Sequence, residues 1–476
     1  MPGPWKIPLQ WVVGAAAGYC TVFLYNLNLA TTTTTSISVG TNQTLSWNVS
    51  PGECSNGADE NKSETRRHDN LLPFLRDIVD HGELPAVAAF TGKDHSSFYG
   101  ASAGRRRRWS RAEASVFDFW HLGSNTKSMT AMILAMLIQD NLLSWNSTLG
   151  DLLADYTMLP QYAPITVSDL TTHHSGLTDE HLTALFAQLY SWSAADGRTR
   201  LSAATLNQPS SSTRGTFSYA NINYIIAGLL IDRLTGSPAE DAFANRLFSP
   251  LALSDAGFGP LPEASTFSVC SPWPHIAVAW PVATFLGRGR AGGVVPYFSS
   301  LRYRDNPPAL NTAGRVHMRM WQYGLYLAAA LQGARGQAIP QLNISAESAA
   351  LLNIVHGEAD GEGCRRTFGG WRRCEDESHG DSDGVGDGDR GEGKFVLMHD
   401  GSNTKYYVHA AVDVGKRRTY TAFTNRGDDV AMELVRGIVK WMRDGMGVHG
   451  HGRGDDGDRH YEVEGLEEAE GLTEEL

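Results

Sequence analysis

The pentapeptide Gly-Ser-Asn-Thr-Lys occurs twice in this chain of 476 residues, at 123–127 and at 401–405. Each copy places a serine three positions before a lysine. In a helix, residues three positions apart lie on one face, about 5–6 Å apart, so that a lysine amine can take a proton from a serine hydroxyl. In a strand, they point to opposite faces. The surroundings of the two copies therefore decide which one can supply a nucleophile.

The two copies precede different kinds of secondary structure. Apolar residues follow the first copy at spacings of three, four and seven, and neither Gly nor Pro interrupts them before about Asp140, which predicts a buried helix. The second copy leads into residues 406–414, which are rich in β-branched and aromatic residues and predict a strand. We therefore predict that Ser124 and Lys127 form the nucleophile pair, and that the serine and lysine of the second copy diverge.

The N-terminal residues have the pattern of a targeting segment. Lys6 precedes the apolar run 11–25, and Ala30 offers a cleavage point, so residues 1–30 are predicted to be a signal peptide or, alternatively, the uncleaved anchor of a type II membrane protein. Either form sends the chain into the secretory pathway. Residues 31–68 are predicted to be a Thr/Ser-rich glycosylated linker. Asn-x-Ser/Thr sequons predict glycosylation at Asn42, Asn48, Asn61, Asn146 and Asn343.

Cysteine usage agrees with an extracellular chain. Cys20 lies in the apolar run, and the four remaining cysteines can form two disulfides. A bond between Cys364 and Cys374 is favoured because it closes a short loop, which leaves Cys54 to pair with Cys270. No Cys-x-x-Cys spacing indicates zinc, and the sequence predicts no metal site.

The order of predicted elements indicates an α/β (α+β) fold. The predicted helices and strands at the two ends are a helix at 70–81, strands at 85–91, 96–102, 394–400, 405–414 and 417–425, and an amphipathic helix at 428–442. The region between them, up to about residue 350, is mostly helical, most clearly at 223–235 and 319–331. We therefore expect one antiparallel sheet built from both termini, flanked by helices, with an inserted helical subdomain.

Two further segments are predicted to be disordered. Residues 356–393 are rich in Gly, Asp and Glu, and so is the tail at 444–476. The net charge of −12 gives no support to nucleic-acid binding. A hydrophobic content of 42% is sufficient for the core of a large enzyme.

Four motifs occur in one order along the chain. They are the nucleophile segment 119–127, the segment 165–177 ending in Ser-Gly-Leu, the segment 217–221 containing Tyr-x-Asn, and His399-Asp400-Gly401. Over roughly residues 69–443 the chain resembles the serine β-lactamase and penicillin-binding-protein-like superfamily. The resemblance is strongest to the branch of class C β-lactamases, family VIII carboxylesterases, D-aminopeptidases and fungal acyltransferases of the statin side-chain type.

The resemblance implies a catalytic role for the first copy of the pentapeptide. Ser124 is expected to be the nucleophile, and Lys127 and Tyr219 to shuttle its proton. Tyr219 could otherwise be one more core aromatic residue. Asn221 could cap the helix that begins after it, or donate a hydrogen bond from its amide to Lys127 or the substrate, and these roles are compatible.

The resemblance also gives the second copy a use. Gly401 allows the backbone to approach the substrate closely, and the N–H of Ser402, beside that of Ser124, matches the second oxyanion donor. His399 stands where the Lys-Thr-Gly lysine belongs; outside the family context it would be a structural histidine. His173 and the histidine after it are expected to pack in a loop.

The predicted function is a serine hydrolase that acts on a small ester or amide through an acyl enzyme on Ser124, without a cofactor. Because a histidine is largely neutral near pH 7, His399 favours esters and D-amino-acid derivatives over the carboxylate of a β-lactam. The alternatives are an acyltransferase of secondary metabolism, a true β-lactamase or D-aminopeptidase, and, least favoured, an inert surface glycoprotein. A membrane partner is expected only for an uncleaved anchor, and the oligomeric state stays open.

Overall fold

The computed structural model describes residues 70–81, 84–93, 97–262, 271–278, 293–299, 303–375 and 395–445. Several predictions lie outside these residues: the targeting segment, the linker with its three sequons, the pairing of Cys54 with Cys270, and nearly all of the acidic tail. Within the described ranges, no helix has the length and apolar character needed to cross a membrane.

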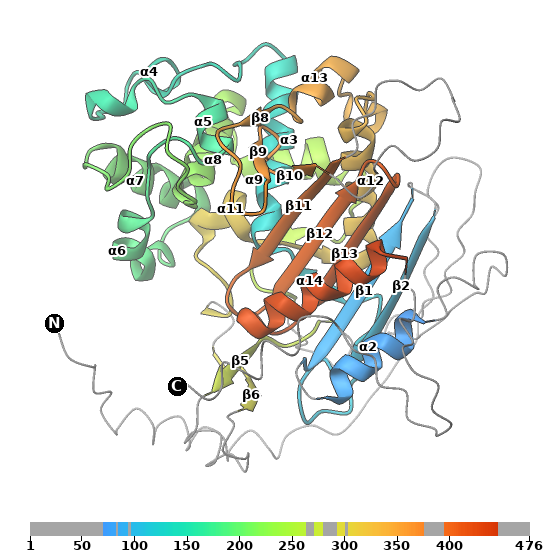
Figure 1. Cartoon of the computed structure of the whole chain (residues 1–476). Helices are drawn as coiled ribbons and strands as arrows, with labels where there is room; N and C mark the ends of the chain where they lie inside the picture. Colours follow the sequence, from blue (N-terminus) through green and yellow to red (C-terminus); the bar gives the residue numbers. More distant parts are fainter. Residues whose placement is uncertain are drawn as a thin grey trace, which may run out of the picture. The chain divides into compact units, whose positions relative to one another are not determined.

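An eight-stranded sheet forms the frame of the fold, and every neighbouring pair in it is antiparallel. Its order is β2-β1-β13-β12-β11-β10-β9-β8, and Figure 1 shows strands from both ends of the described chain side by side. The strands are β1 Ala86–Gly92, β2 Phe98–Gly104, β8 Val355–His356, β9 Arg365–Thr367, β10 Arg372–Glu375, β11 Phe395–Ser402, β12 Tyr407–Asp413 and β13 Arg418–Thr424. The predicted sheet built from both termini is confirmed, because β1 pairs with β13.

Helices cover both faces of this sheet. On one face lie α2 (Leu71–Asp80) and α14 (Asp429–Arg443), the two helices predicted at the ends of the fold. Their apolar stripes meet where Phe74 stacks on Trp441, with ring centroids 4.1 Å apart. The other face packs against α12 (Met320–Ala334) and the large core of the helical region.

The region between the strands is mostly helical, as predicted. Its remaining helices are α3 Thr126–Gln139, α4 Leu149–Leu152, α5 Val167–Thr171, α6 Glu180–Leu189, α7 Ala194–Leu206, α8 Ile222–Thr235, α9 Ala239–Ala242, α11 Asn311–Gly314 and α13 Ala346–Leu351. Two small sheets were not predicted: β3 (Phe119–His121), β7 (Val316–Arg319) and β4 (Gly257–Phe258) form one, and β5 (His275–Val278) and β6 (Gly293–Pro296) form the other. Residues on nearly every side of α3 and α8 are buried, which is typical of helices inside a core.

The prediction that residues 356–393 are a disordered insertion is wrong for residues 356–375. This part forms most of β8–β10 and extends the sheet by three strands. The predicted disulfide between Cys364 and Cys374 is confirmed and joins the two ends of the β9–β10 hairpin. The Gly and acid content indicated disorder, but the covalent bond and buried Trp371 hold strands of only two to four residues. Residues 376–394 lie outside the described ranges.

Candidate active site

Ser124 lies on a single 3₁₀ turn, Gly123–Asn125, directly before α3. Lys127 follows in the first turn of α3, and its Nζ is 3.0 Å from the Oγ of Ser124. The predicted proximity is confirmed, although Ser124 precedes the α-helix and does not lie within it.

The ammonium group of Lys127 is fully buried and has a complete set of acceptors. Besides Ser124 Oγ, it donates to Asn221 Oδ1 at 2.9 Å and to the carbonyl of Ala313 at 2.7 Å. The rings of Tyr219 and Tyr224 lie 5.0 and 5.6 Å from its nitrogen. Because an ammonium has three N–H donors, none is left over, and the amine is held at a fixed position beside the serine.

Tyr219 is the second side chain that contacts Ser124. Its hydroxyl donates to Ser124 Oγ at 2.7 Å, and the residue is 43% exposed, so it is not a core aromatic. The ring of His173 lies under it, with centroids 4.4 Å apart. Burial, followed by the nearby charge of Lys127, holds the pKa of His173 well below its usual range. A neutral, buried His173 fits the predicted packing role.

Asn221 bonds to Lys127 as an acceptor, through Oδ1, and not as the expected donor, and its side chain does not cap α8. Asp179, which sequence reasoning missed, accepts from the backbone N–H groups of Asn221 and Ile222 at 2.9 Å each. Asp179 also accepts from Nδ2 of Asn221 at 2.9 Å. Since a carboxylate only accepts and an ammonium only donates, the two partners fix the orientation of the Asn221 amide.

The second pentapeptide packs directly against the first. A Cβ added to Gly123 would lie 2.4 Å from the backbone nitrogen of Ser402, and one added to Gly401 would lie 2.1 Å from the carbonyl oxygen of Leu122. Both glycines are therefore required by the close approach of two backbones. This contact brings the main chain of Ser402 beside the turn that carries Ser124.

The side chains of the second copy diverge, as predicted. The Oγ of Ser402 accepts from the N–H of Thr404 at 2.9 Å and donates to the carbonyl of Gly427 at 3.3 Å. The amine of Lys405 lies 3.4 Å from the carbonyl oxygen of Asn403 instead. Ser402 has no general base within its own copy.

His399 lies at a cavity of about 200 Å³ that adjoins Tyr219. The cavity is lined by Tyr219, Arg366, Arg372, Met398, His399 and Asp400. Burial, and then the neighbouring cations Arg366 and Lys127, lower the pKa of His399 to about 3. Its Nδ1 donates to the carbonyl of Asp400 at 2.7 Å, which leaves Nε2 as a hydrogen-bond acceptor. His399 is thus a neutral group in the cleft.

The fold and these four motifs agree with the comparison to known families. The family model described as Beta-lactamase matches residues 74–434. The chain belongs to the beta-lactamase family. The family model spans the motifs that contain Ser124, Tyr219 and His399, and both copies of the pentapeptide.

Relatives and solved structures of this beta-lactamase family member were also found. The unguisins hydrolase ungD′ of Aspergillus campestris is 30% identical over 141 residues, which are 28% of this chain and 26% of that protein. The lovastatin esterase of Penicillium rubens is 26% identical over 206 residues, or 38% of this chain and 51% of that protein. The chain therefore spans about a quarter to about half the length of these curated relatives. The D-amino acid amidase of Ochrobactrum anthropi shares the fold, with a TM-score of 0.61 at 18% identity over 80% of this chain and 98% of that one.

One further group in this beta-lactamase family member was missed by sequence reasoning. The repeat is longer than five residues, because His121 and His399 stand at the same position before the two copies. The Nδ1 of His121 accepts from the N–H of Gly123 at 3.0 Å, and its Nε2 lies 3.0 Å from Asp305 Oδ1. Asp305 Oδ1 also accepts from Nδ2 of Asn403 at 3.0 Å. One carboxylate thus joins both copies.

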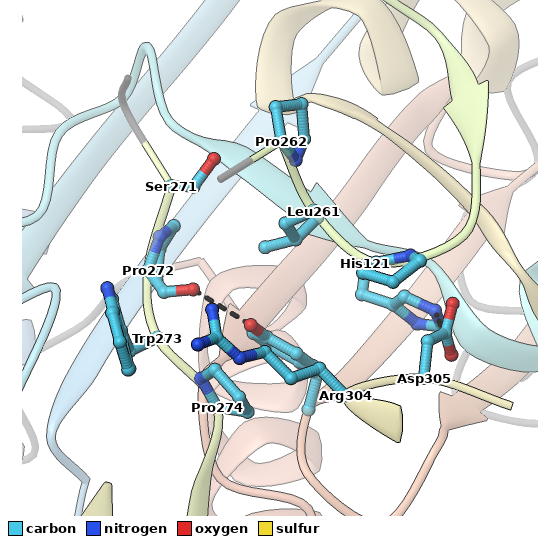
Figure 2. A pocket seen from close by; sticks show the side chains of 11 residues that line it. His121, Leu261, Pro262, Ser271, Pro272, Trp273, Pro274, Arg304 and Asp305 are labelled. Atoms are coloured by element: carbon cyan, nitrogen blue, oxygen red, sulfur yellow. Dashed lines mark hydrogen bonds and ion pairs between the residues drawn. The ribbon is translucent and has the colours of Figure 1, made fainter. Parts of the chain in front are cut away.

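The surroundings of Asp305 keep it charged. Figure 2 shows its carboxylate beside the ring of His121, at the edge of a small cavity of about 20 Å³. Burial by itself raises the pKa of Asp305, but the neighbouring His121 and Arg315 outweigh burial and hold the pKa well below its usual range. The aspartate has no distinctive sequence neighbours, so only the fold could reveal its position between the two copies.

Proposed function

We propose that this protein is a serine hydrolase that cleaves an ester or amide through an acyl enzyme on Ser124. The observation that carries the proposal is the position of Ser124 Oγ, 3.0 Å from the amine of Lys127 and 2.7 Å from the hydroxyl of Tyr219. Because Tyr219 is partly exposed, a substrate can approach the hydroxyl of Ser124 along this side chain. An inert glycoprotein would have no reason to keep a fully buried lysine beside a serine.

The reaction follows from the hydrogen bonds. The pair of Lys127 and Tyr219 acts as a base once it has lost one proton, as a free amine or a tyrosinate. Ser124 Oγ then bonds to the substrate carbonyl carbon while its proton passes to this pair, and the pair returns that proton to the leaving alcohol or amine. Water then attacks the ester on Ser124 by the same route, which frees the acid. The contact between the two copies supports the N–H groups of Ser124 and Ser402 as the donors to the developing oxyanion.

An ester or amide of a natural product is the favoured substrate class. Two relatives, a lovastatin esterase and an unguisins hydrolase, support hydrolysis of such compounds. The neutral state of His399 removes the cation that a lysine would place there for the carboxylate of a β-lactam. Robust turnover of nitrocefin would reverse this order of substrates.

Activity-based labelling tests the proposal. A fluorophosphonate probe should form an adduct on Ser124, found by mass mapping of the labelled peptide. We expect Ser124→Ala to abolish the label and Ser402→Ala, the matched change in the second copy, to retain it. Labelling that survives in Ser124→Ala would contradict the assignment of the nucleophile.

We also propose that the chain matures in the secretory pathway. Asn146 and Asn343 are exposed and accessible to glycosylation, and the Cys364–Cys374 disulfide suits an oxidising compartment. Expressed in a eukaryotic secretion host, the protein should lose apparent mass on treatment with an N-glycosidase. Each of Asn146→Gln and Asn343→Gln should remove one step of that shift.

A further inference from the structure

Three of the four basic side chains around the cleft already have a defined partner or state. The ammonium of Lys127 uses all its donors on Ser124, Asn221 and Ala313. His399 is neutral and is an acceptor on the side of Nε2. Arg372 pairs with Asp360 at 2.6 Å and with Glu362 at 2.8 Å.

The fourth basic side chain, Arg366, has no such partner. It lines the same cavity as Tyr219 and His399, and its guanidinium lies 5.3 Å from the ring centroid of Phe217. Asp400, the one carboxylate among the lining residues, pairs with His409 and Arg436 instead, and no ion pair between described residues involves Arg366. Arg366 is partly buried, and a cation withdrawn from water without a counter-ion is costly. A partly buried cation in a reactive cleft is therefore suited to bind an anionic group of a ligand.

The backbone around Arg366 fixes its place in the cleft. Arg366 lies on β9, and its partner across the ladder to β10 is Arg372. The disulfide between Cys364 and Cys374 joins the two ends of this hairpin. The paired Arg372 and the unpaired Arg366 therefore stand side by side at one cavity, and only one of them is neutralised by the protein itself.

We propose that Arg366 binds a carboxylate of the substrate, so that the preferred substrate of the Ser124 site is an acidic ester or amide. A guanidinium presents two parallel N–H donors that match the two oxygens of a carboxylate, which a neutral histidine cannot do. The inference rests on the proposed hydrolase function and adds the substrate class. The cation here comes from β9 and not from the position of His399.

Paired substrates test this inference. The first pair is the para-nitrophenyl monoester of adipic acid and its methyl ester, which differ by an anion on the acyl side. The second pair is para-butanoyloxybenzoate and its methyl ester, which differ by an anion on the leaving group. We expect wild type to prefer the acid in at least one pair by about 10- to 100-fold in kcat/KM, the usual effect of a charge-assisted hydrogen bond.

The variants separate Arg366 from its neighbours. Arg366→Met should bring the ratio of acid to methyl ester close to one, and Arg366→Lys should restore part of the preference. Arg365→Met is the matched control, because Arg365 is exposed, lies next to Arg366 on the same strand and does not line the cavity. That control should keep the wild-type ratio. Fluorophosphonate labelling of Arg366→Met reports whether its site is still folded.

Each outcome decides the inference separately from the hydrolase function. If wild type hydrolyses the methyl esters without preferring either acid, Arg366 does not bind the substrate, while the proposed function stands. If Arg366→Met slows acid and methyl ester equally, Arg366 acts through Tyr219 and the inference is again wrong. If no ester is hydrolysed and Ser124 is not labelled, the proposed function fails. Calorimetric binding of adipate monomethyl ester to Ser124→Ala, with and without Arg366→Met, then decides whether Arg366 receives an anion.

Discussion

The two copies of Gly-Ser-Asn-Thr-Lys have one sequence and two conformations. In the first, a 3₁₀ turn leading into α3 brings Ser124 and Lys127 to 3.0 Å. In the second, the end of β11 and a turn send Ser402 to the backbone of Thr404 and Lys405 to the backbone of Asn403. The comparison shows that backbone conformation, and not the identity of the residues, makes one serine a candidate nucleophile.

The asparagines of the two copies show the same contrast. Both are buried. Asn125 accepts from the hydroxyl of Tyr323 at 2.8 Å and so anchors its turn to α12. Asn403 instead accepts from the N–H groups of Lys405 and Tyr406, at 3.2 and 3.1 Å, and closes its own turn. Each copy therefore uses its polar side chains to hold the conformation in which it is found.

Changing the two lysines should give the largest difference between the copies. Lys127→Met should lower kcat/KM by about 10³-fold, because the general acid and base group beside Ser124 is lost. Lys405→Met should change kcat/KM by less than about twofold, since the contacts of its amine among the described residues are a backbone carbonyl of its own turn and the face of Tyr297. Steady-state hydrolysis of a para-nitrophenyl ester measures both. Equal losses in the two variants would refute the division of roles.

Asp305 tests whether the copies depend on each other. Asp305→Asn should destabilise the protein by about 3 kcal/mol, because Arg315 is then left without its buried counter-ion and the contact to His121 weakens. Urea unfolding followed by circular dichroism measures the change in the free energy of unfolding.

Asp255→Asn is the matched control for Asp305. Asp255 also pairs with an arginine, Arg319 at 2.9 Å, but it is substantially exposed. We expect its loss to cost less than about 1 kcal/mol. Similar costs for the two changes would mean that Asp305 does not hold the copies together.

The contact between the two backbones gives a smaller effect. Gly401→Ala should cost about 2 kcal/mol, because the new methyl group would meet the carbonyl oxygen of Leu122 and the amide of Asn125. Gly361→Ala is the control, since nothing lies within 4 Å of a Cβ there. Thermal unfolding of the two variants should differ clearly. A Gly401→Ala protein as stable as wild type would contradict the close packing of the copies.

The elements that could be predicted are those whose own residues show an apolar stripe or a β-branched run. The apolar stripe of α14 and the β-branched runs of β12 and β13 marked those elements to within a few residues. The Ser-x-x-Lys spacing and the Tyr-x-Asn motif located Ser124, Lys127 and Tyr219. These groups are either periodic or close together in sequence.

What the sequence did not reveal depends on contacts between distant residues. The strands β8, β9 and β10 are too short to show a period, and a disulfide and ion pairs stabilise them in place of an apolar pattern. Asp179 and Asp305 act through partners far away along the chain, and no local signal distinguishes them from surface aspartates. The longer repeat, which includes His121, was the one available signal for the Asp305 cluster.

The smallest expected effect concerns His399, at the head of the second copy, and the way in which the stability of the protein depends on pH. The folded protein holds the pKa of His399 at about 3, against an ordinary value of 6.5. The unfolded chain therefore takes up the proton first, so stability is complete above about pH 6.5 and is lost as the pH falls from there toward 3. At pH 5.5 the loss due to this histidine is about 1 kcal/mol.

His399→Gln should therefore lose less stability than wild type between pH 7 and pH 5.5, as measured by urea unfolding at both pH values. Other buried histidines, such as His317, whose pKa burial lowers to about 4, destabilise both proteins alike in acid, so the difference between them isolates His399. Ser402→Ala changes the same copy without removing a titrating group and should follow the wild-type curve. Identical pH dependence in His399→Gln and wild type would mean that His399 takes up a proton in the folded protein as readily as in the unfolded one. The cleft would then hold a titrating cation at the head of the second copy, and the contrast between a neutral His399 and a charged Arg366 would be lost.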